Sequence, residues 1–161
     1  MFQAEQEDIF FMEKACKLAE ESVEIGGGPF GAVIVLKDGT ILGKGRNQVT
    51  EKKDPTLHAE IVAIRNACQS VDDFRLSGCT IYSSCEPCPM CLSAIYWARI
   101  DRVVYGNTRE QAKNIGFDDS FIYEEVSKSV EERKIQMEHL HMDMTKNAFD
   151  MWSEKIIKIE Y

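Results

Sequence analysis

Residues 79–105 read CTIYSSCEPCPMCLSAIYWARIDRVVY, and this stretch decides the fold. Residues 79–84 predict a strand, residues 88–98 predict a helix, and residues 102–105 predict a second strand. A strand, a helix of about ten residues and another strand in succession are typical of a βαβ crossover, whose strands are parallel. The sequence therefore predicts an α/β fold with a parallel portion of sheet.

The residues before this stretch predict an antiparallel hairpin. A continuous apolar run over 32–36, rich in β-branched residues, is typical of a strand buried on both faces. Asp38-Gly39 is a hairpin turn signal, and residues 40–47 would form the returning strand, whose two glycines permit a bulge. We therefore expect a mixed sheet that opens with this hairpin.

Helical patterns precede and follow the hairpin. Apolar positions recur at helical spacing over 7–25, and Gly26 ends that pattern. A second helix is predicted to open at Asp54-Pro55, with proline in its first turn, and to continue over 58–69. These helices would cover the sheet, as expected of an α/β layered domain.

The pattern weakens after Thr108. It predicts a short helix over 119–126, an edge strand over 134–138 and a helix over 147–155. No internal repeat or linker composition interrupts the chain. We therefore expect residues 1–161 to form a single domain.

The composition favours a small diffusible substrate. The chain has 161 residues and a formal net charge of -8, whereas a protein that docks on nucleic acid normally carries a basic face. No apolar run reaches the length of about 18 residues that a membrane span needs. The acidic N-terminus lacks the basic region of a secretory signal. We expect a cytoplasmic protein with no nucleic-acid or membrane partner.

The six cysteines indicate metal chemistry in preference to disulfides. A cytoplasmic chain is kept reduced, and Cys85, Cys88 and Cys91 crowd into seven residues. The cysteines at positions 16, 68 and 79 lie in or beside apolar-periodic stretches, so we expect them to be buried small hydrophobes.

Two predicted helix starts carry residues that bind zinc. Cys88 and Cys91 lie three apart on one helix face, at the positive helix end that stabilises thiolates. His58 opens the other helix, and Glu60 follows two residues later. His58, Cys88 and Cys91 make a three-ligand set, the number of protein ligands in a catalytic zinc site. Glu60 would be a nearby carboxylate that moves protons.

Three other interpretations of the cysteines stay open. The C-x2-C-x2-C run occurs in ferredoxin cluster motifs, although Ile95 stands where the fourth cysteine would be. A structural zinc with Cys85 as fourth ligand would make a non-enzymatic module. A dithiol redox pair is the third alternative. The complete pattern, H-x-E followed by P-C-x-x-C, is more specific than its parts and is typical of zinc nucleobase deaminases.

That signature predicts a hydrolytic reaction. Zinc lowers the pKa of a bound water to about 7, so that a nucleophile for an amidine-like ring carbon forms at neutral pH. Glu60 would take the proton of the water, protonate the ring nitrogen and help the amine to leave as ammonia.

Longer stretches carry a resemblance beyond the metal motif: GGPFGAVIV (27–35), DPTLHAE (54–60), SCEPCPMC (84–91), AIYWAR (94–99), GFDDSFIY (116–123) and the closing Glu160-Tyr161. With them, nearly the whole chain resembles the bacterial guanine deaminases of the cytidine-deaminase superfamily. The zinc motif is common to the superfamily, whereas GFDDSFIY and the terminal tyrosine are more discriminating.

The resemblance implies a three-layer α/β/α sandwich around a five-stranded mixed sheet. It also implies a homodimer that exchanges C-terminal segments, so that Tyr161 would complete the active site of the partner. One zinc ion per subunit is implied, with Glu60 as the proton shuttle. The implied zinc ligands are His58, Cys88 and Cys91, and the implied substrate contacts are Asn47, Asp119 and Tyr161.

These roles suit the chemistry of guanine. The base presents N1–H and a 2-amino group as adjacent donors, which the Asp119 carboxylate would accept. Asn47 can donate and accept, so it suits the edge with O6 or N7. Phe30 or Trp97 would supply a flat wall for the purine.

The predicted function is hydrolytic deamination of guanine to xanthine and ammonia. The nearest alternatives are deamination of guanosine and of small aminotriazines such as ammeline, which share the amidine edge. A tRNA adenosine deaminase has the same zinc motif, but the acidic charge balance disfavours it. A pair of histidines, His139 and His141, receives no role.

Overall fold

The computed structural model describes residues 2–161, with side chains described from Glu5 onward. The chain forms two compact units, Met1–Asp119 and Ser120–Tyr161, and the expected single domain stays a prediction. We call them the first and second unit. No helix in the described part of the chain combines the length and apolarity that crossing a membrane requires.

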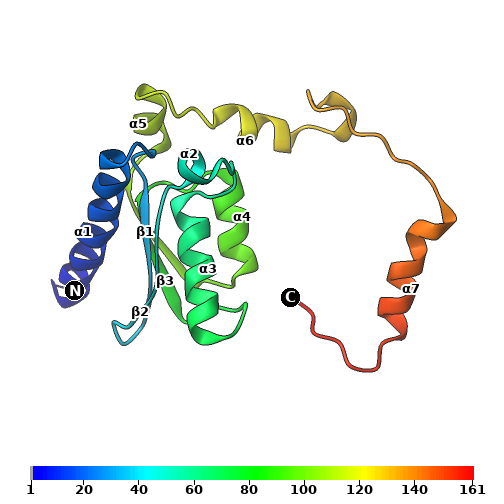
Figure 1. Cartoon of the computed structure of the whole chain (residues 1–161), viewed down its shortest axis with the longest axis horizontal. Coiled ribbons are helices and arrows are strands. Elements are labelled where there is room, and N and C mark those ends of the chain that lie inside the picture. The colour runs from blue at the N-terminus through cyan, green and yellow to red at the C-terminus, as the bar shows by residue number, and fades with distance from the viewer. Residues whose placement is uncertain (1) are drawn as a thin grey trace. The chain divides into compact units, whose positions relative to one another are not determined.

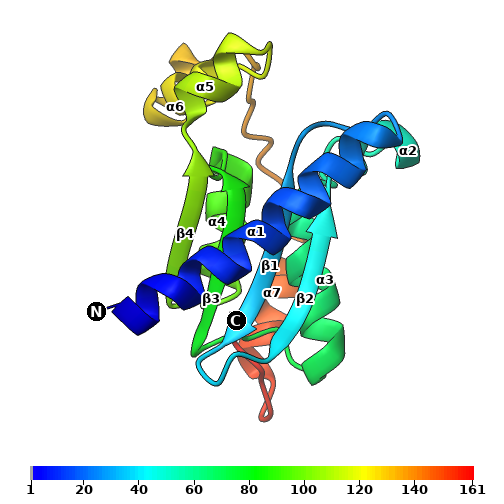
Figure 2. The same cartoon turned by 90° about the vertical axis from the view of Figure 1, so that its left-hand side faces the viewer.

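A four-stranded mixed sheet forms the centre of the first unit. Its strands are β1 (Gly31–Leu36), β2 (Ile41–Arg46), β3 (Cys79–Cys85) and β4 (Arg102–Asn107) (Figure 1). Their order in the sheet is β2-β1-β3-β4 (Figure 2). β1 pairs antiparallel with β2 and β3, whereas β3 and β4 are parallel. The predicted hairpin and the predicted βαβ crossover are both confirmed.

The register of the hairpin shifts between Ile34 and Val35, beside Gly43 of β2. This confirms the predicted bulge. The two glycines of β2 have a second role, because a Cβ on Gly43 would overlap the carbonyl of Ala63 and one on Gly45 would overlap that of Ala59. Only glycine therefore lets the helix that carries these alanines approach β2 so closely.

Helices cover both faces of the sheet and make three layers. α1 (Phe2–Glu24) crosses one face, and α3 (Ala59–Val71) and α4 (Pro89–Trp97) lie on the other (Figure 2). Each face has its own core. The α1 side buries Phe11, Ala15, Val33, Val35 and Tyr82; the α3 and α4 side buries Ala32, Ile34, Ala59, Ala63, Ala67, Leu76, Cys79, Ile81, Ile95 and Ala98.

A polar cluster attaches α1 to the sheet. Arg102 of β4 donates two hydrogen bonds to the Asp8 carboxylate, at 2.8 and 2.5 Å, and the Tyr82 hydroxyl donates to Asp8 at 2.8 Å. The hydrogen bond from Arg102 lowers the pKa of Asp8 against the effect of burial. Burial and the Asp8 carboxylate raise the pKa of Tyr82 to about 12. Charge pairing thus supplements the apolar packing of α1.

Several predicted helix boundaries were wrong. α3 begins at Ala59 instead of Asp54, because the Asp54 side chain accepts hydrogen bonds from the Thr56 amide and hydroxyl and forms a turn there. α4 begins at Pro89, with Cys88 as its N-cap. Two short helices, α2 (Val49–Lys52) and α5 (Arg109–Asn114), were not predicted from the sequence.

The predicted fifth strand is absent from the described residues. Residues 134–138, expected to form an edge strand, are irregular, and Ile135 and Met137 are exposed. A strand exists only where its backbone groups pair with a neighbour. The sheet of this chain therefore has four strands, and the expected count of five is corrected.

The second unit contains α6 (Ser120–Ser127) and α7 (Asn147–Glu154), joined through two short 3-10 turns, Val130–Glu132 and Asp143–Lys146. The predicted helices near 119–126 and 147–155 are confirmed. Every described residue of this unit is at least partly exposed. Its exposed large apolar side chains are Phe121, Val126, Val130, Ile135, Met137, Leu140, Met142, Met144, Phe149, Met151, Trp152, Ile156, Ile157, Ile159 and Tyr161. The second unit therefore has no buried core of its own.

Candidate metal centre

Two helix N-termini place three metal-binding side chains together. His58 is the N-cap of α3, Cys88 is the N-cap of α4, and Cys91 lies in the first turn of α4. The His58 Nδ1 atom is 3.5 Å from the Sγ atom of each cysteine. All three donor atoms lie within 4.8 Å of one another. The long-range packing of α3 beside α4 thus assembles the set that the sequence predicted from two separate motifs.

Glu60 lies beside this set in the first turn of α3 and is only 6% exposed. Its Oε2 atom accepts a hydrogen bond from the Cys91 thiol at 3.4 Å. Its Oε1 atom accepts one from the Ser83 hydroxyl at 3.2 Å. The carboxylate therefore touches the three-residue set without belonging to it.

The protonation of the two cysteines differs. Hydrogen bonds from Cys91 and from His58 lower the pKa of Cys88 to about 4. The hydrogen bond between Cys91 and Cys88, together with burial, raises the pKa of Cys91. The hydrogen bond to Cys88 raises the pKa of His58, although burial opposes it. The centre thus stabilises a thiolate, which is the form of cysteine that binds a metal ion.

Burial also affects the two carboxyl groups near the centre. Desolvation raises the pKa of Glu60, and the negative charge at Cys88 adds to the effect. Desolvation and then Cys88 likewise raise the pKa of Asp119. The negative charge of Cys88 therefore disfavours the ionised form of Asp119, the last residue of the first unit.

The donor set fits zinc. One ring nitrogen and two sulfurs are ligands that zinc takes in proteins, and three protein ligands are the usual number at a catalytic site. Cys85 is not in the set. Its thiol donates to the Thr108 carbonyl at 3.8 Å, and burial raises its pKa to about 11, so it stays a protonated, structural thiol. Among the described residues, the cluster has no fourth protein ligand of the His, Cys or acidic type.

The other cysteines do not approach the centre. Cys79 is buried and Cys68 partly buried, as expected. Cys16 is exposed, contrary to expectation, because it lies on the outer side of α1, next in sequence to the buried Ala15. All six cysteines are unpaired thiols, so the expected absence of disulfides holds for the structure.

Asn47 follows β2 and is 6% exposed. Its backbone N–H donates to the Phe30 carbonyl at 3.0 Å, and its backbone carbonyl accepts from the buried Ser22 hydroxyl at 3.2 Å. Its side-chain Oδ1 accepts from the Val49 amide at 3.2 Å. Because Oδ1 is engaged, the side chain of Asn47 offers its Nδ2–H groups as donors.

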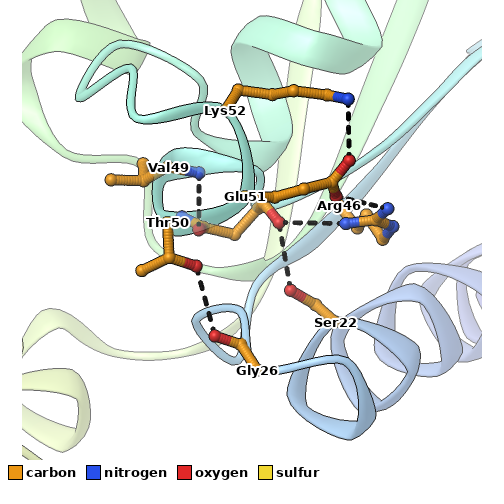
Figure 3. A network of polar contacts seen from close by, with 8 residues as sticks. Ser22, Gly26, Arg46, Val49, Thr50, Glu51 and Lys52 are labelled. Atoms are coloured by element: carbon orange, nitrogen blue, oxygen red, sulfur yellow. Dashed lines mark hydrogen bonds and ion pairs between the residues drawn. The ribbon is translucent and has the colours of Figure 1, made fainter.

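A polar network joins the loop after α1 to the segment that contains α2 (Figure 3). The Thr50 hydroxyl donates to the Gly26 carbonyl at 3.2 Å. Glu51 pairs with Arg46 and with Lys52, each at 2.8 Å. These contacts, together with Ser22, hold the backbone on both sides of Asn47.

Phe30 lies next to Asn47. A Cβ added at Gly28 would contact the rings or side-chain carbons of both residues. The Phe30 ring packs edge-to-face on Phe117, with centroids 4.9 Å apart and an interplanar angle of 87°. Phe30 is thus positioned between the Asn47 segment and the segment that leads to Asp119.

The two remaining predicted site residues differ in placement. Trp97 ends α4 and is 58% exposed, at the opposite end of the helix from Cys88 and Cys91. Over six residues a helix rises about 9 Å, so within this chain the structure does not bring Trp97 to the metal-binding set. Tyr161 ends the second unit and is exposed; its expected role stays a prediction.

Sequence reasoning missed Ser83 and Ser22. Ser83 contacts Glu60, and Ser22 holds the Asn47 backbone. A signal existed for Ser83, since a hydroxyl interrupts the apolar alternation of Cys79, Ile81 and Cys85 on one strand face. Ser22 gave no such signal, because polar residues surround it in the helix.

The comparisons with known proteins agree with this geometry. Residues 5–107 match the family model for the cytidine and deoxycytidylate deaminase zinc-binding region. The chain is 49% identical to guanine deaminase of Bacillus subtilis, over 94% of this chain and 97% of that protein. A crystal structure of guanine deaminase from B. subtilis superposes with a TM-score of 0.91, at 48% identity and the same coverage.

Two more distant relatives match a shorter segment. A tRNA-specific adenosine deaminase of Aquifex aeolicus is 43% identical over 60% of this chain and 63% of its own length. A structure of guanine deaminase from Nitrosomonas europaea gives a TM-score of 0.65 at 29% identity, over 68% of this chain and 63% of that one. The family model and the relative that matches almost end to end agree with the metal-centre geometry. Together they show that this chain belongs to the cytidine and deoxycytidylate deaminase zinc-binding family and, within it, to the guanine deaminases.

Proposed function

We propose that this chain catalyses the hydrolytic deamination of guanine to xanthine and ammonia. The observation that carries the proposal is the buried Glu60 carboxylate beside the His58, Cys88 and Cys91 set. The relative from B. subtilis, which matches over 94% of this chain, is a guanine deaminase. One zinc ion per subunit is part of the proposal, and a cytoplasmic location stays a prediction.

His58, Cys88 and Cys91 would hold the zinc ion, which when bound supplies Lewis-acid activation of a water molecule at neutral pH. Glu60 would accept a proton from the water as the water oxygen adds to C2 of guanine, and would pass that proton to the ring nitrogen N3. It would then take the remaining proton from the new hydroxyl on C2 and deliver it to the amino group, which leaves as ammonia as the C2–N bond breaks. Water and guanine are thus converted to xanthine and ammonia with no other reactant.

The environment of Glu60 suits this shuttle. Burial raises the pKa of its carboxyl group, which brings proton uptake and release closer to neutral pH. A group with an ordinary carboxyl pKa would hold a proton too weakly to transfer it efficiently at that pH. The same burial keeps bulk water away from the carboxylate.

The substrate contacts follow from the neighbouring groups. Asp119 accepts from the N1–H and 2-amino donors of guanine. Asn47, whose Oδ1 already accepts from Val49, donates through Nδ2 to an acceptor such as O6 or N7. Phe30 lies against the purine ring beside Asn47.

A homodimer that exchanges the second unit is also part of the proposal. The support is the large number of exposed apolar side chains in that unit, among them Phe149, Ile156 and Ile157. Many exposed large apolar side chains in one short unit are typical of a segment that a partner covers. In such a dimer Tyr161 of one subunit would complete the active site of the other.

The test is a zinc-loaded assay on guanine, guanosine, ammeline, adenine and tRNA, with metal content measured in the same sample. We expect about one zinc per chain and the highest kcat/KM on guanine. Equal or faster turnover of another substrate would overturn the assignment of guanine. Salt-sensitive tRNA binding without activity on the free base would favour the adenosine-deaminase alternative.

A further inference from the structure

Ser83 occupies an unusual place in β3. Successive strand residues point to opposite faces, so Cys79, Ile81, Ser83 and Cys85 share the face that α3 and α4 cover. Cys79 and Ile81 belong to the apolar core of that face, whereas Ser83 brings a hydroxyl into it and is 2% exposed. Burying a hydroxyl costs free energy unless it is hydrogen-bonded, so the Ser83 hydroxyl needs a hydrogen-bond partner within this core.

That partner is Glu60. The Ser83 hydroxyl donates to Glu60 Oε1 at 3.2 Å, across the interface between β3 and the first turn of α3. The backbone of Ser83 is fixed on both sides, since β3 pairs with β1 through Ala32 and with β4 through Tyr105. The donor therefore projects from the rigid centre of the sheet.

The two oxygens of Glu60 have partners of different kinds. Oε2 accepts from the Cys91 thiol at 3.4 Å. A cysteine that ligates a metal ion is a thiolate and has no proton to donate, so that hydrogen bond ends when Cys91 becomes a ligand. The hydrogen bond from Ser83 to Oε1 does not depend on the state of Cys91. With Cys91 bound to a metal ion, Ser83 alone of these two side chains would remain as a donor to the carboxylate.

We propose that Ser83 is a positioning residue, which anchors Glu60 Oε1 so that Oε2 faces the reacting water and the ring nitrogen. The inference rests on the proposed function, because it assigns Ser83 a part in the proton transfer by Glu60. A rigid donor fixes the carboxylate rotamer before the substrate arrives, and misplacing a proton-transfer group lowers the rate of the chemical step more than binding.

The experiment compares Ser83→Ala and Ser83→Thr with the wild type, all zinc-loaded. Ser83→Ala should lower kcat on guanine about tenfold, which corresponds to about 1.4 kcal/mol, and leave KM within about twofold. Ser83→Thr keeps the hydroxyl on a strand position and should restore kcat. Zinc content and zinc affinity, measured by competition with a chelator, should match the wild type in both variants.

A crystal structure of Ser83→Ala gives a readout independent of turnover. We expect the Glu60 carboxylate to rotate or to show two conformers, with the metal ligands unmoved. Ser84→Ala is the matched control, since Ser84 is the next residue, is also buried and accepts a hydrogen bond from the Gly31 amide at 3.0 Å on the opposite face of the sheet. It should lower the melting temperature without changing kcat.

Three results would overturn the inference. They are a wild-type kcat in Ser83→Ala, an unmoved single conformer of Glu60 in its crystal structure, and a loss of zinc or of melting temperature that fully accounts for the lower rate. A wild-type protein without activity on guanine would instead reject the proposed function, so the two failures are distinguishable.

Discussion

The first unit of this chain buries many of its apolar side chains, whereas the second unit buries none. Residues 1–119 bury two cores, one on each face of the sheet. Residues 120–161 carry Phe, Trp, Ile and Met side chains but bury none of them. Because burial of apolar surface is the main driving force for folding, the first unit contains its own source of stability and the second does not. All three residues of the metal-binding set lie in the first unit, and the exposed apolar side chains of the second unit are the support for the proposed exchange of that unit between subunits.

The largest expected effect tests whether the first unit contains the chemistry. Glu60→Ala should reduce kcat by about 10²- to 10⁴-fold, because it removes the group that transfers protons. Zinc content should not change, since the three ligands are intact. Steady-state kinetics and metal analysis of one sample measure both quantities. A variant that retains its rate would show that Glu60 is a structural residue.

The next effect distinguishes the cysteines. Cys88→Ala removes a donor of the three-residue set and should weaken zinc binding by at least about 100-fold, with loss of turnover. Cys85→Ala is the control, because its thiol donates to the Thr108 carbonyl outside the set. It should bind zinc as tightly as the wild type in a chelator competition. Equal losses in both variants would indicate a four-ligand structural zinc.

A third variant tests the contrast between the units directly. Phe149→Asp places a charge on an apolar position of α7 and should weaken the proposed dimer by at least about tenfold, since burying a phenylalanine contributes roughly 1.5–3 kcal/mol. Ser153→Asp adds the same charge at another exposed position of α7 and should have little effect. Sedimentation over a concentration series measures the dimer. A monomeric wild type, or a Phe149→Asp dimer of unchanged affinity, would contradict the proposal.

The smallest effect concerns the attachment of α1 within the first unit. The pKa of Asp8 is lowered by Arg102, so its folded value lies below its unfolded value, which is near 3.9. The pair therefore stabilises the fold above about pH 4, and its contribution is lost as the pH falls through the folded pKa.

Asp8→Asn should accordingly cost at most about 1 kcal/mol at pH 7, because the Arg102 side chain is half exposed and solvent screens the pair. The stability difference from the wild type should shrink as the pH falls below about 4. Denaturant unfolding at several pH values measures it. A difference that stays constant across this range would show that the charge of Asp8 has no part in attaching α1.

Much of the first unit follows from local pattern. The continuous apolar run of β1 predicted a strand buried on both faces, and the strand–helix–strand pattern predicted the parallel pairing of β3 and β4. Both predictions are confirmed, because strand and helix periodicity survive packing. The helix start at Asp54 was wrong, since a local turn held by the Asp54 side chain competes with the helix. The edge strand at 134–138 was wrong because strand pairing depends on a partner that sequence pattern does not reveal.

The metal centre shows the same division. The spacing of H-x-E and P-C-x-x-C predicts that His58, Cys88 and Cys91 form one set. The rule that helix N-termini stabilise anions supports this grouping. The motif spacing did not predict where the other side chains of these elements point. Trp97 shares a helix with Cys91 but lies at its far end, and Cys85 shares the motif but donates to Thr108.

The sequence alone thus determined which residue types make up the metal-binding set, and in which α/β layers they occur, because periodicity and motif spacing are local properties. Tertiary structure decided which way each side chain points. Ser83 meets Glu60 from 23 residues away, and Cys91 reaches His58 from 33 residues away. Such contacts depend on the register of β3 against β1 and on the close approach of α3 that Gly43 and Gly45 permit. These are non-local packing relations, which no short stretch of sequence contains.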